Sequence, residues 1–270
     1  MLYEKVRLET GKASLTVFKP EGVKNNGAVL VIPGGGYSVV CWDREGEPIS
    51  LAYAARGLTA FMLEYSVGSD AAGHMPLVEA SAAMAYIRRN AGKYEIDPER
   101  VYAVGFSAGG HLAASLAVFW HRADVISRAG IKYGENRPDA VVLCYPVVTA
   151  FEKAHKASFY NIIGSTSPTD SQLEYYSVEK HVDKNSAPAF IMHTANDRAV
   201  PVENSLYLAE SYAAADVPFE LHIYPDAPHG LALANEITAN GNPDHIRPQA
   251  ARWLDDSIIF LKNLRPQQNV

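Results

Sequence analysis

Six short, continuously apolar runs alternate with segments of helical character, and this alternation constrains the fold more than any other feature. The runs lie at residues 28–32, 59–63, 101–104, 140–144, 189–192 and 219–223. Helices are expected at residues 48–55, 76–90, 108–120, 202–214 and 247–264. Apolar runs of this length fit strands that helices cover on both faces. The chain is therefore predicted to be an α/β protein with a doubly wound, mostly parallel sheet and right-handed crossovers.

The whole chain, residues 1–270, is expected to form a single domain, because α/β folds of this length commonly run as one unit. Alternating segments at residues 3–8 and 14–18 predict antiparallel strands at one edge of the sheet. The aromatic-rich segment 147–187 interrupts the alternation. It is expected to form either a partial lid or subsite insertion, or a small core of its own.

Composition excludes several classes of partner. Lys and Arg number 24 against 30 Asp and Glu, and the net charge of −6 opposes binding to nucleic acid or to an anionic membrane surface. Cys41 and Cys144 stand far apart with no C-x-x-C pattern, so both are expected to be reduced thiols. The absence of an apolar leader and of an 18-residue apolar run predicts a cytoplasmic protein.

Cofactor motifs are also missing. The sequence contains no H-E-x-x-H, P-loop or dinucleotide-binding pattern, so no metal and no organic cofactor are expected. The expected partner is a small molecule, and a homo-oligomer is left open.

The most informative string is Gly105-Phe106-Ser107-Ala108-Gly109-Gly110, which contains a G-x-S-x-G pattern. The pattern alone arises by chance in roughly a tenth of sequences of this length. Here an apolar run precedes it and a small-residue helix follows, and that strand, sharp turn and helix are typical of a nucleophile elbow. The glycines suit a turn where strand and helix approach too closely for a Cβ. Ser107 is therefore predicted to be a nucleophile.

A serine nucleophile needs a base, and the base needs an orienting acid. In this architecture the chain order is Ser, then acid, then His. Asp197 follows the run 189–192 and His229 follows the run 219–223, so both are expected at the carboxyl edge of the sheet near Ser107. Asp226 is the main alternative acid, but its position fits less well than that of Asp197.

The other histidines and acids are given structural interpretations. His111 is expected to form a local hydrogen bond and to support the turn at Ser107. His193 and His222 are expected to be core or edge residues of the sheet. Asp183 and Glu203 are expected to be solvated surface charges.

The string Pro33-Gly34-Gly35-Gly36-Tyr37 directly follows the first apolar run. Attack on a carbonyl creates an oxyanion, which preorganised N–H donors must stabilise. Three glycines allow the backbone to turn its amides inward, and the N–H of Ala108 adds a further donor. A glycine run alone is weak support, but beside a nucleophile elbow it predicts an oxyanion hole.

These motifs, with Asp97-Pro98-Glu99-Arg100 and the segment Trp42-Asp43-Arg44-Glu45-Gly46-Glu47-Pro48, resemble the α/β-hydrolase superfamily, and within it the acetylxylan esterase-like carbohydrate esterases. The resemblance covers roughly residues 27–264. It implies a triad of Ser107, His229 and Asp197, with an oxyanion hole formed by the N–H groups of Gly35, Gly36 and Ala108. Pro33 replaces the His of the related lipase group, and only 32 residues precede it, so a helical cap and a long-chain lipase are not expected.

The expected activity is that of a serine carboxylesterase that removes short acyl groups through an acyl-enzyme. The substrates suggested by the resemblance are acetylated sugars or xylo-oligosaccharides. An arylformamidase or a small peptidase with the same triad is an alternative, as is a non-catalytic small-molecule-binding protein on a hydrolase scaffold.

Two aromatic residues after the glycines are candidates for substrate binding. Tyr37 and Trp42 are expected to line the entrance and to stack on a sugar ring, while Asp43, Arg44 or Glu45 bonds its hydroxyls. In the alternative interpretation, Trp42 packs under the loop and Glu45 caps the following helix.

Overall fold

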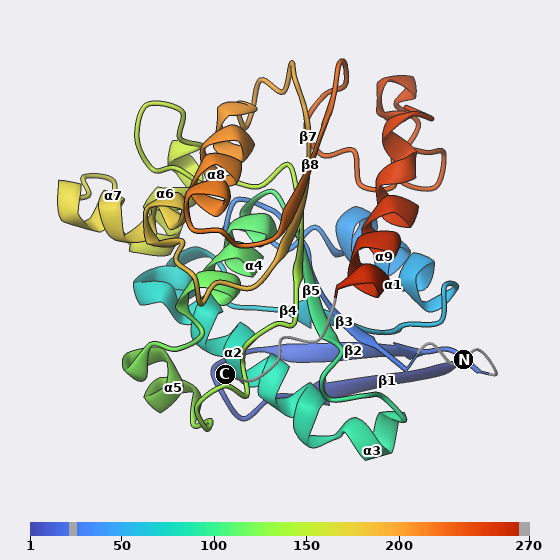
Figure 1. Cartoon of the computed structure of the whole chain (residues 1–270). Helices are drawn as coiled ribbons and strands as arrows, with labels where there is room; N and C mark the ends of the chain where they lie inside the picture. Colours follow the sequence, from blue (N-terminus) through green and yellow to red (C-terminus); the bar gives the residue numbers. More distant parts are fainter. Residues whose placement is uncertain (22–25, 265–270) are drawn as a thin grey trace.

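A single sheet organises the chain in the computed structural model, which describes residues 1–21 and 26–264. Within these residues eight strands pair in the order β1-β2-β4-β3-β5-β6-β7-β8 (Figure 1). The strands are β1 Leu2–Arg7, β2 Ser14–Lys19, β3 Ala28–Ile32, β4 Thr59–Glu64, β5 Val101–Phe106, β6 Val141–Cys144, β7 Ala189–Thr194 and β8 Phe219–Tyr224. β1 and β2 are antiparallel at one edge, and β4, β3, β5, β6, β7 and β8 are parallel. The predicted mostly parallel sheet is confirmed.

Helices cover both faces of the sheet (Figure 1). They are α1 Glu47–Ala54, α2 Met75–Arg89, α3 Ala91–Tyr94, α4 Ala108–Phe119, α5 Ala123–Ala129, α6 Lys156–Ile163, α7 Asp170–Tyr176, α8 Glu203–Ala214 and α9 Trp253–Asn263. Figure 1 shows α1 and α9 on one face and α2, α4 and α8 on the other. This is the doubly wound arrangement that the alternation of runs and helices predicts.

Strand β3 shows why the central runs are apolar throughout. Its residues Ala28, Leu30 and Ile32 pack into the core on the α2 and α4 side. Val29 and Val31 pack into the core on the α1 and α9 side. Each such Val, Leu or Ile contributes about 1.5–3 kcal/mol when fully buried, so a polar residue on either face would be costly.

Two expectations about the elements are wrong. Strand β8 is not covered on both faces, because it forms the sheet edge and its residues are exposed or only partly buried. The last helix begins at Trp253 rather than at residue 247. Arg247 precedes Pro248, which disfavours the helical conformation of the residue before it.

The segment 147–187 joins β6 to β7 and contains α6, α7 and the short 3₁₀ helix Val178–His181. Its side chains Phe159, Ile162 and Val178 are buried in the same core as α2 and α4. The segment is therefore not a separate small core, and α6 lies beside the loop that follows β3, because Asn161 Nδ2 donates to the carbonyl of Gly36 at 2.8 Å.

His111 on α4 ties this segment to the loop after β3. Its Nδ1 accepts from the Tyr37 hydroxyl at 2.8 Å and its Nε2–H donates to the Tyr176 carbonyl at 2.8 Å. The expected local hydrogen bond is thus wrong, since both partners are distant in sequence. Burial lowers the pKa of His111 to about 4, although the bond to Tyr176 opposes the shift.

This buried imidazole predicts a loss of stability in acid. A folded-state pKa of about 4 lies below the ordinary value of about 6.5. The contribution of neutral His111 to the free energy of unfolding is therefore complete above pH 6.5 and is lost as the pH falls towards 4. We expect a loss of up to about 3 kcal/mol over this range. Urea unfolding of the wild type and His111→Gln at pH 7, 5.5 and 4.5 measures it. The variant should have a lower free energy of unfolding at pH 7 but should lose less of it on acidification. Parallel curves of unfolding free energy against pH for the two proteins would contradict the prediction.

Candidate active site

Ser107 occupies a strained turn between β5 and α4. Its backbone has φ 54° and ψ −118°, a conformation that a non-glycine residue adopts only where its surroundings impose it. Its N–H donates to Cys144 O at 3.0 Å, and its carbonyl accepts from Val147 N at 3.0 Å and His111 N at 3.1 Å. These bonds on both sides of the residue fix the turn and present the hydroxyl at the carboxyl end of β5.

The glycines of the motif are required by contact with neighbouring backbone. A Cβ on Gly105 would lie 2.1 Å from Gly109 O, and a Cβ on Gly109 would lie 2.2 Å from Ile32 O. No side chain fits at such distances. The first turn of α4 can therefore pack directly on the ends of β5 and β3, as the sequence predicts.

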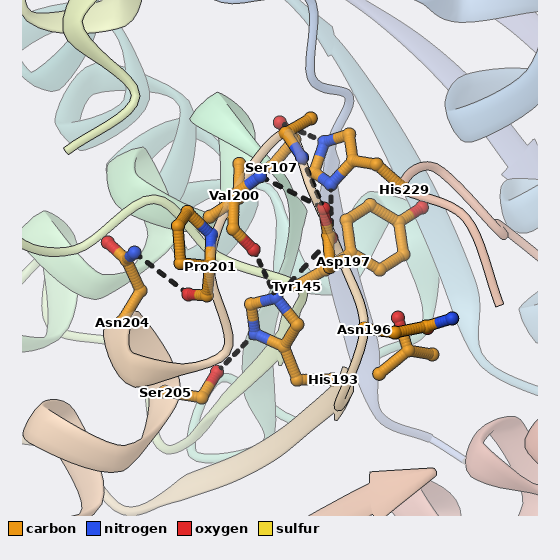
Figure 2. Close-up of polar contacts among 12 residues, drawn as sticks. Ser107, Tyr145, His193, Asn196, Asp197, Val200, Pro201, Asn204, Ser205 and His229 are labelled. Atoms are coloured by element: carbon orange, nitrogen blue, oxygen red, sulfur yellow. Dashed lines mark hydrogen bonds and ion pairs between the residues drawn. The ribbon is translucent and has the colours of Figure 1, made fainter. Parts of the chain in front are cut away.

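Three side chains from separate loops meet at this edge of the sheet (Figure 2). His229 Nε2 lies 2.8 Å from Ser107 Oγ, and His229 Nδ1 lies 2.6 Å from Asp197 Oδ2. With Nδ1–H donating to the carboxylate, Nε2 is left as the acceptor for the serine hydroxyl. The Asp197 side chain is fully buried, whereas that of His229 is 23% exposed. The geometry is that of a serine, base and acid in hydrogen-bond sequence.

Asp197 is held as a carboxylate by its hydrogen bonds. Oδ1 accepts from the N–H groups of Ala199 and Val200, both at 2.9 Å. Burial alone would raise the pKa of Asp197, but the hydrogen bonds from His193 and His229 outweigh it and leave the pKa well below its ordinary value. The carboxylate is therefore ionised at neutral pH and can stabilise an imidazolium at His229.

The competing residues lie elsewhere. Asp226 is exposed and pairs with Asn196 and Arg247, not with His229. His222 lies on the edge strand β8, where it stacks on Phe190. Asp183 accepts N–H bonds within its own turn, and Glu203 pairs with Lys153 at 2.8 Å.

His193 is buried, as expected, but it has a further contact that the sequence did not reveal. Its Nδ1 lies 2.7 Å from Ser205 Oγ, and its Nε2 lies 2.9 Å from Val200 O and 3.4 Å from Asp197 Oδ2 (Figure 2). It therefore supports the carboxylate from the side opposite His229.

The loop after β3 that contains Gly34, Gly35 and Gly36, here called the glycine loop, lies against Ser107. A Cβ on Gly34 would be 3.0 Å from Ser107 Cβ. Gly35 and Gly36 have φ of +125° and +64°, which glycine adopts without strain. Among the hydrogen bonds of residues 1–21 and 26–264, none uses the N–H of Gly35, Gly36 or Ala108. The Gly34 N–H is different, because it donates to the Glu45 carboxylate at 2.8 Å.

The described residues hold no cluster of three or more His, Cys, Asp or Glu side chains suited to a metal ion. Within the same residues, every helix is too short or too polar to cross a membrane.

Comparison with known proteins places this chain in a family. Residues 15–212 match the BD-FAE family model, a stretch that includes Ser107 and Asp197 and ends before His229. The chain belongs to the BD-FAE family. It is 40% identical over 218 residues to endo-1,4-beta-xylanase B of Butyrivibrio fibrisolvens, covering 79% of this chain and 34% of that protein. It is 30% identical over 250 residues to the acetylxylan esterase of Xylanibacter ruminicola, covering 91% of this chain and 48% of that protein.

The chain thus spans a third to a half of the length of these two relatives. Solved structures resemble it over more of their length. An acetyl ester-xyloside bifunctional hydrolase from Caldicellulosiruptor lactoaceticus has a TM-score of 0.79 and 32% identity, covering 93% of this chain and 88% of that chain. The carboxylesterase Cest-2923 from Lactobacillus plantarum has a TM-score of 0.83 and 27% identity, with 97% of both chains covered. The predicted α/β-hydrolase fold and the resemblance to acetylxylan esterases are confirmed.

The two predicted substrate-binding aromatics of this BD-FAE member have different environments. Tyr37 is only 1% exposed and lies beneath the glycine loop, packed on Tyr65 and His111. Its expected position at the entrance is wrong, because its hydroxyl is used inside the core. Trp42 is 54% exposed, so the alternative in which it packs under the loop is wrong.

Two residues beside the glycine loop have roles or positions that the sequence does not predict. Glu45 was expected to bind sugar hydroxyls or to cap a helix, but its carboxylate is buried and does neither. His155 is half-buried, with Cε1 3.8 Å from the position of a Cβ on Gly36. Burial and the nearby His229 lower the pKa of His155. No motif marks His155, and the segment that contains Glu45 does not indicate that its carboxylate is buried, since each residue reaches the site only through packing.

Proposed function

We propose that this protein is a serine carboxylesterase that removes short acyl groups, acetyl above all, from sugar-like alcohols. The observation that carries the proposal is the unbroken series of hydrogen bonds from Ser107 through His229 to Asp197, beside a glycine loop with unused N–H groups. Membership of the BD-FAE family and the resemblance to an acetylxylan esterase support the reaction class.

The proposed acylation step uses this arrangement of side chains. His229 Nε2 takes the hydroxyl proton of Ser107 as Oγ forms a bond to the carbonyl carbon of the ester. The negative charge that develops on the carbonyl oxygen is stabilised by the N–H groups of Gly35, Gly36 and Ala108. Collapse of the tetrahedral intermediate breaks the bond to the alcohol oxygen, which receives the proton from His229. Asp197 stabilises the imidazolium while that proton is held.

Deacylation reverses these roles with water. His229 accepts a proton from a water molecule, whose oxygen attacks the acyl carbon. When the bond to Ser107 Oγ breaks, His229 returns the proton to Oγ and the carboxylic acid leaves. Each N–H donor to the oxyanion is expected to contribute about 2.7–4 kcal/mol of transition-state stabilisation.

The alcohol side of the substrate is proposed from two observations. Trp42 presents an exposed ring six residues after Gly36, the last glycine of the loop, and the flat C–H face of a sugar packs well on such a ring. Two of the relatives are named for xylan or its acetyl esters. We infer that acetylated xylo-oligosaccharides are the substrate class.

Replacing the proposed nucleophile tests the reaction class. Ser107→Ala should lower kcat for p-nitrophenyl acetate by roughly 10⁴ to 10⁶ with the fold intact, because the triad acts as a unit. A fluorophosphonate probe should label the wild type and not the variant, since labelling needs a bond from Oγ to phosphorus. A variant that is still labelled, or still active, would contradict the assignment of Ser107 as the nucleophile.

A panel of formylated aromatic amines and peptidyl amides distinguishes the esterase from a formamidase or a peptidase.

The orienting acid is tested by two matched substitutions. Asp197→Asn should lower kcat by about 10⁴, because the amide favours the wrong His229 tautomer. Asp226→Asn removes an exposed carboxylate three residues from the same histidine and should leave kcat near the wild-type value. Steady-state hydrolysis of p-nitrophenyl acetate measures both, and the reverse ranking would show that Asp226 is the acid.

The proposed sugar contact predicts a selective loss. Trp42→Ala should lower kcat/KM for acetylated xylo-oligosaccharides about tenfold more than for p-nitrophenyl acetate, since only the sugar uses the ring. Tyr133→Ala, another exposed aromatic residue, is the control and should change neither value. Equal losses on the two substrates would remove Trp42 from the substrate site.

A further inference from the structure

Glu45 is a buried carboxylate with two neutral donors. It lies in the π-helical segment Trp42–Gly46 and is 2% exposed. Oε2 accepts from the Gly34 N–H at 2.8 Å, and Oε1 accepts from the Tyr145 hydroxyl at 2.9 Å. A charge buried without a cationic partner is costly, so its hydrogen bonds must compensate it. One of those bonds sets the first peptide of the glycine loop.

Tyr145 connects this carboxylate to the loop that carries His229. Its hydroxyl accepts from the Ala232 N–H at 2.9 Å while donating to Glu45. Burial, and then the Glu45 charge, raise the pKa of Tyr145 well above its ordinary value, so the hydroxyl keeps the proton it donates. Its ring meets the His229 imidazole edge to face, with centroids 5.0 Å apart (Figure 2).

The same segment also approaches the His229 loop through Arg44. The Arg44 guanidinium lies 3.1 Å from the position that a Cβ on Gly230 would take. Adjacent residues of one short helix therefore lie beside both loops, since Glu45 bonds the glycine loop and the Arg44 guanidinium lies near Gly230.

We propose that Glu45 and Tyr145 are a pair of positioning residues that fix the glycine loop and the His229 loop relative to each other. The inference rests on the proposed esterase function, because the distance they set is that between the oxyanion donors and the base. Neither residue is proposed to touch the reacting atoms. Gly34 N–H, Glu45, Tyr145 and Ala232 N–H form one continuous series of hydrogen bonds across the site.

Electrostatics distinguishes positioning from a direct effect of charge. Glu45 Oε2 and Ser107 Cβ both lie within 3.0 Å of the Cβ position on Gly34, so the carboxylate is close to the place where negative charge develops. A negative charge there opposes an oxyanion. The same charge favours the imidazolium that forms on His229 in the same step, so Glu45→Gln changes both charge and geometry. Tyr145→Phe changes no charge, and a fall in kcat in that variant reports lost geometry.

The test uses two single variants, their double variant and a matched control. Glu45→Gln keeps the shape but cannot accept from both Gly34 and Tyr145, and Tyr145→Phe keeps the ring on His229 but removes the hydroxyl. Tyr53→Phe is the control, because Tyr53 is an equally buried tyrosine. Its hydroxyl lies 3.1 Å from Ser257 Oγ and bonds none of the site residues. Readouts are kcat and KM for p-nitrophenyl acetate, the rate of fluorophosphonate labelling of Ser107, and the urea unfolding midpoint.

Each single variant is expected to lower kcat and the labelling rate by about 10 to 100-fold, with KM within about threefold, because small misplacements of reacting groups act on the transition state. The double variant should lose no more than the worse single variant, because both break the same series of bonds. Tyr53→Phe should shift the unfolding midpoint about as much as Tyr145→Phe, and leave kcat near the wild-type value.

Two results would overturn the inference. One is a kcat for both single variants within about threefold of Tyr53→Phe, and the other is a double variant whose loss is the product of the single losses. If Glu45→Gln does not fold, Tyr145→Phe decides the matter against its control. A wild type that shows no Ser107-dependent hydrolysis and no labelling overturns the proposed function instead, and the positioning role with it.

Discussion

The strained turn at Ser107 is the constraint on which the rest of the site depends. A positive φ at a serine costs of order 1–3 kcal/mol and persists only where the surrounding structure determines it. Here Cys144, Val147 and His111 bond its backbone, and the glycines allow α4 to sit directly on β5 and β3. The loop after β3 can then lie within contact of the serine. Without that close packing, Ser107 would not be held in a fixed position relative to the glycine loop and the His229 loop.

The parallel sheet explains why residues so far apart in sequence meet. Ser107, Asp197 and His229 follow β5, β7 and β8, and the carboxyl ends of parallel strands share one edge. This part of the site could be predicted from the sequence, because each residue stands directly after its apolar run or in the loop beyond it. The choice of Asp197 over Asp226 also followed from position alone, and the distance of 2.6 Å to His229 agrees with it.

The remaining features depend on packing that no local pattern encodes. Tyr37 follows the glycines, as an entrance residue would, but its hydroxyl reaches His111 across 74 positions. Glu45 stands in a polar stretch that suggests a surface, but Tyr145, 100 positions away, bonds it in the core. A sequence pattern gives the period of burial and the residues that turn the chain. It does not show which buried polar groups form hydrogen bonds with each other, because that depends on the register of several packed elements at once.

Two buried carboxylates border the proposed site, and their partners set different roles. Asp197 faces an imidazole that can gain a proton, so its charge can stabilise the imidazolium formed during reaction. Within the part of the chain that the structure describes, the Glu45 carboxylate accepts hydrogen bonds from a backbone N–H and from a phenol held in its neutral form, and neither partner gains a proton during the reaction. In the proposed role Glu45 fixes the positions of its two donors. A carboxylate has an acceptor oxygen for each donor, whereas an amide has one acceptor oxygen and one donor group. The same chemical group thus serves electrostatics at Asp197 and, in the proposed role, geometry at Glu45.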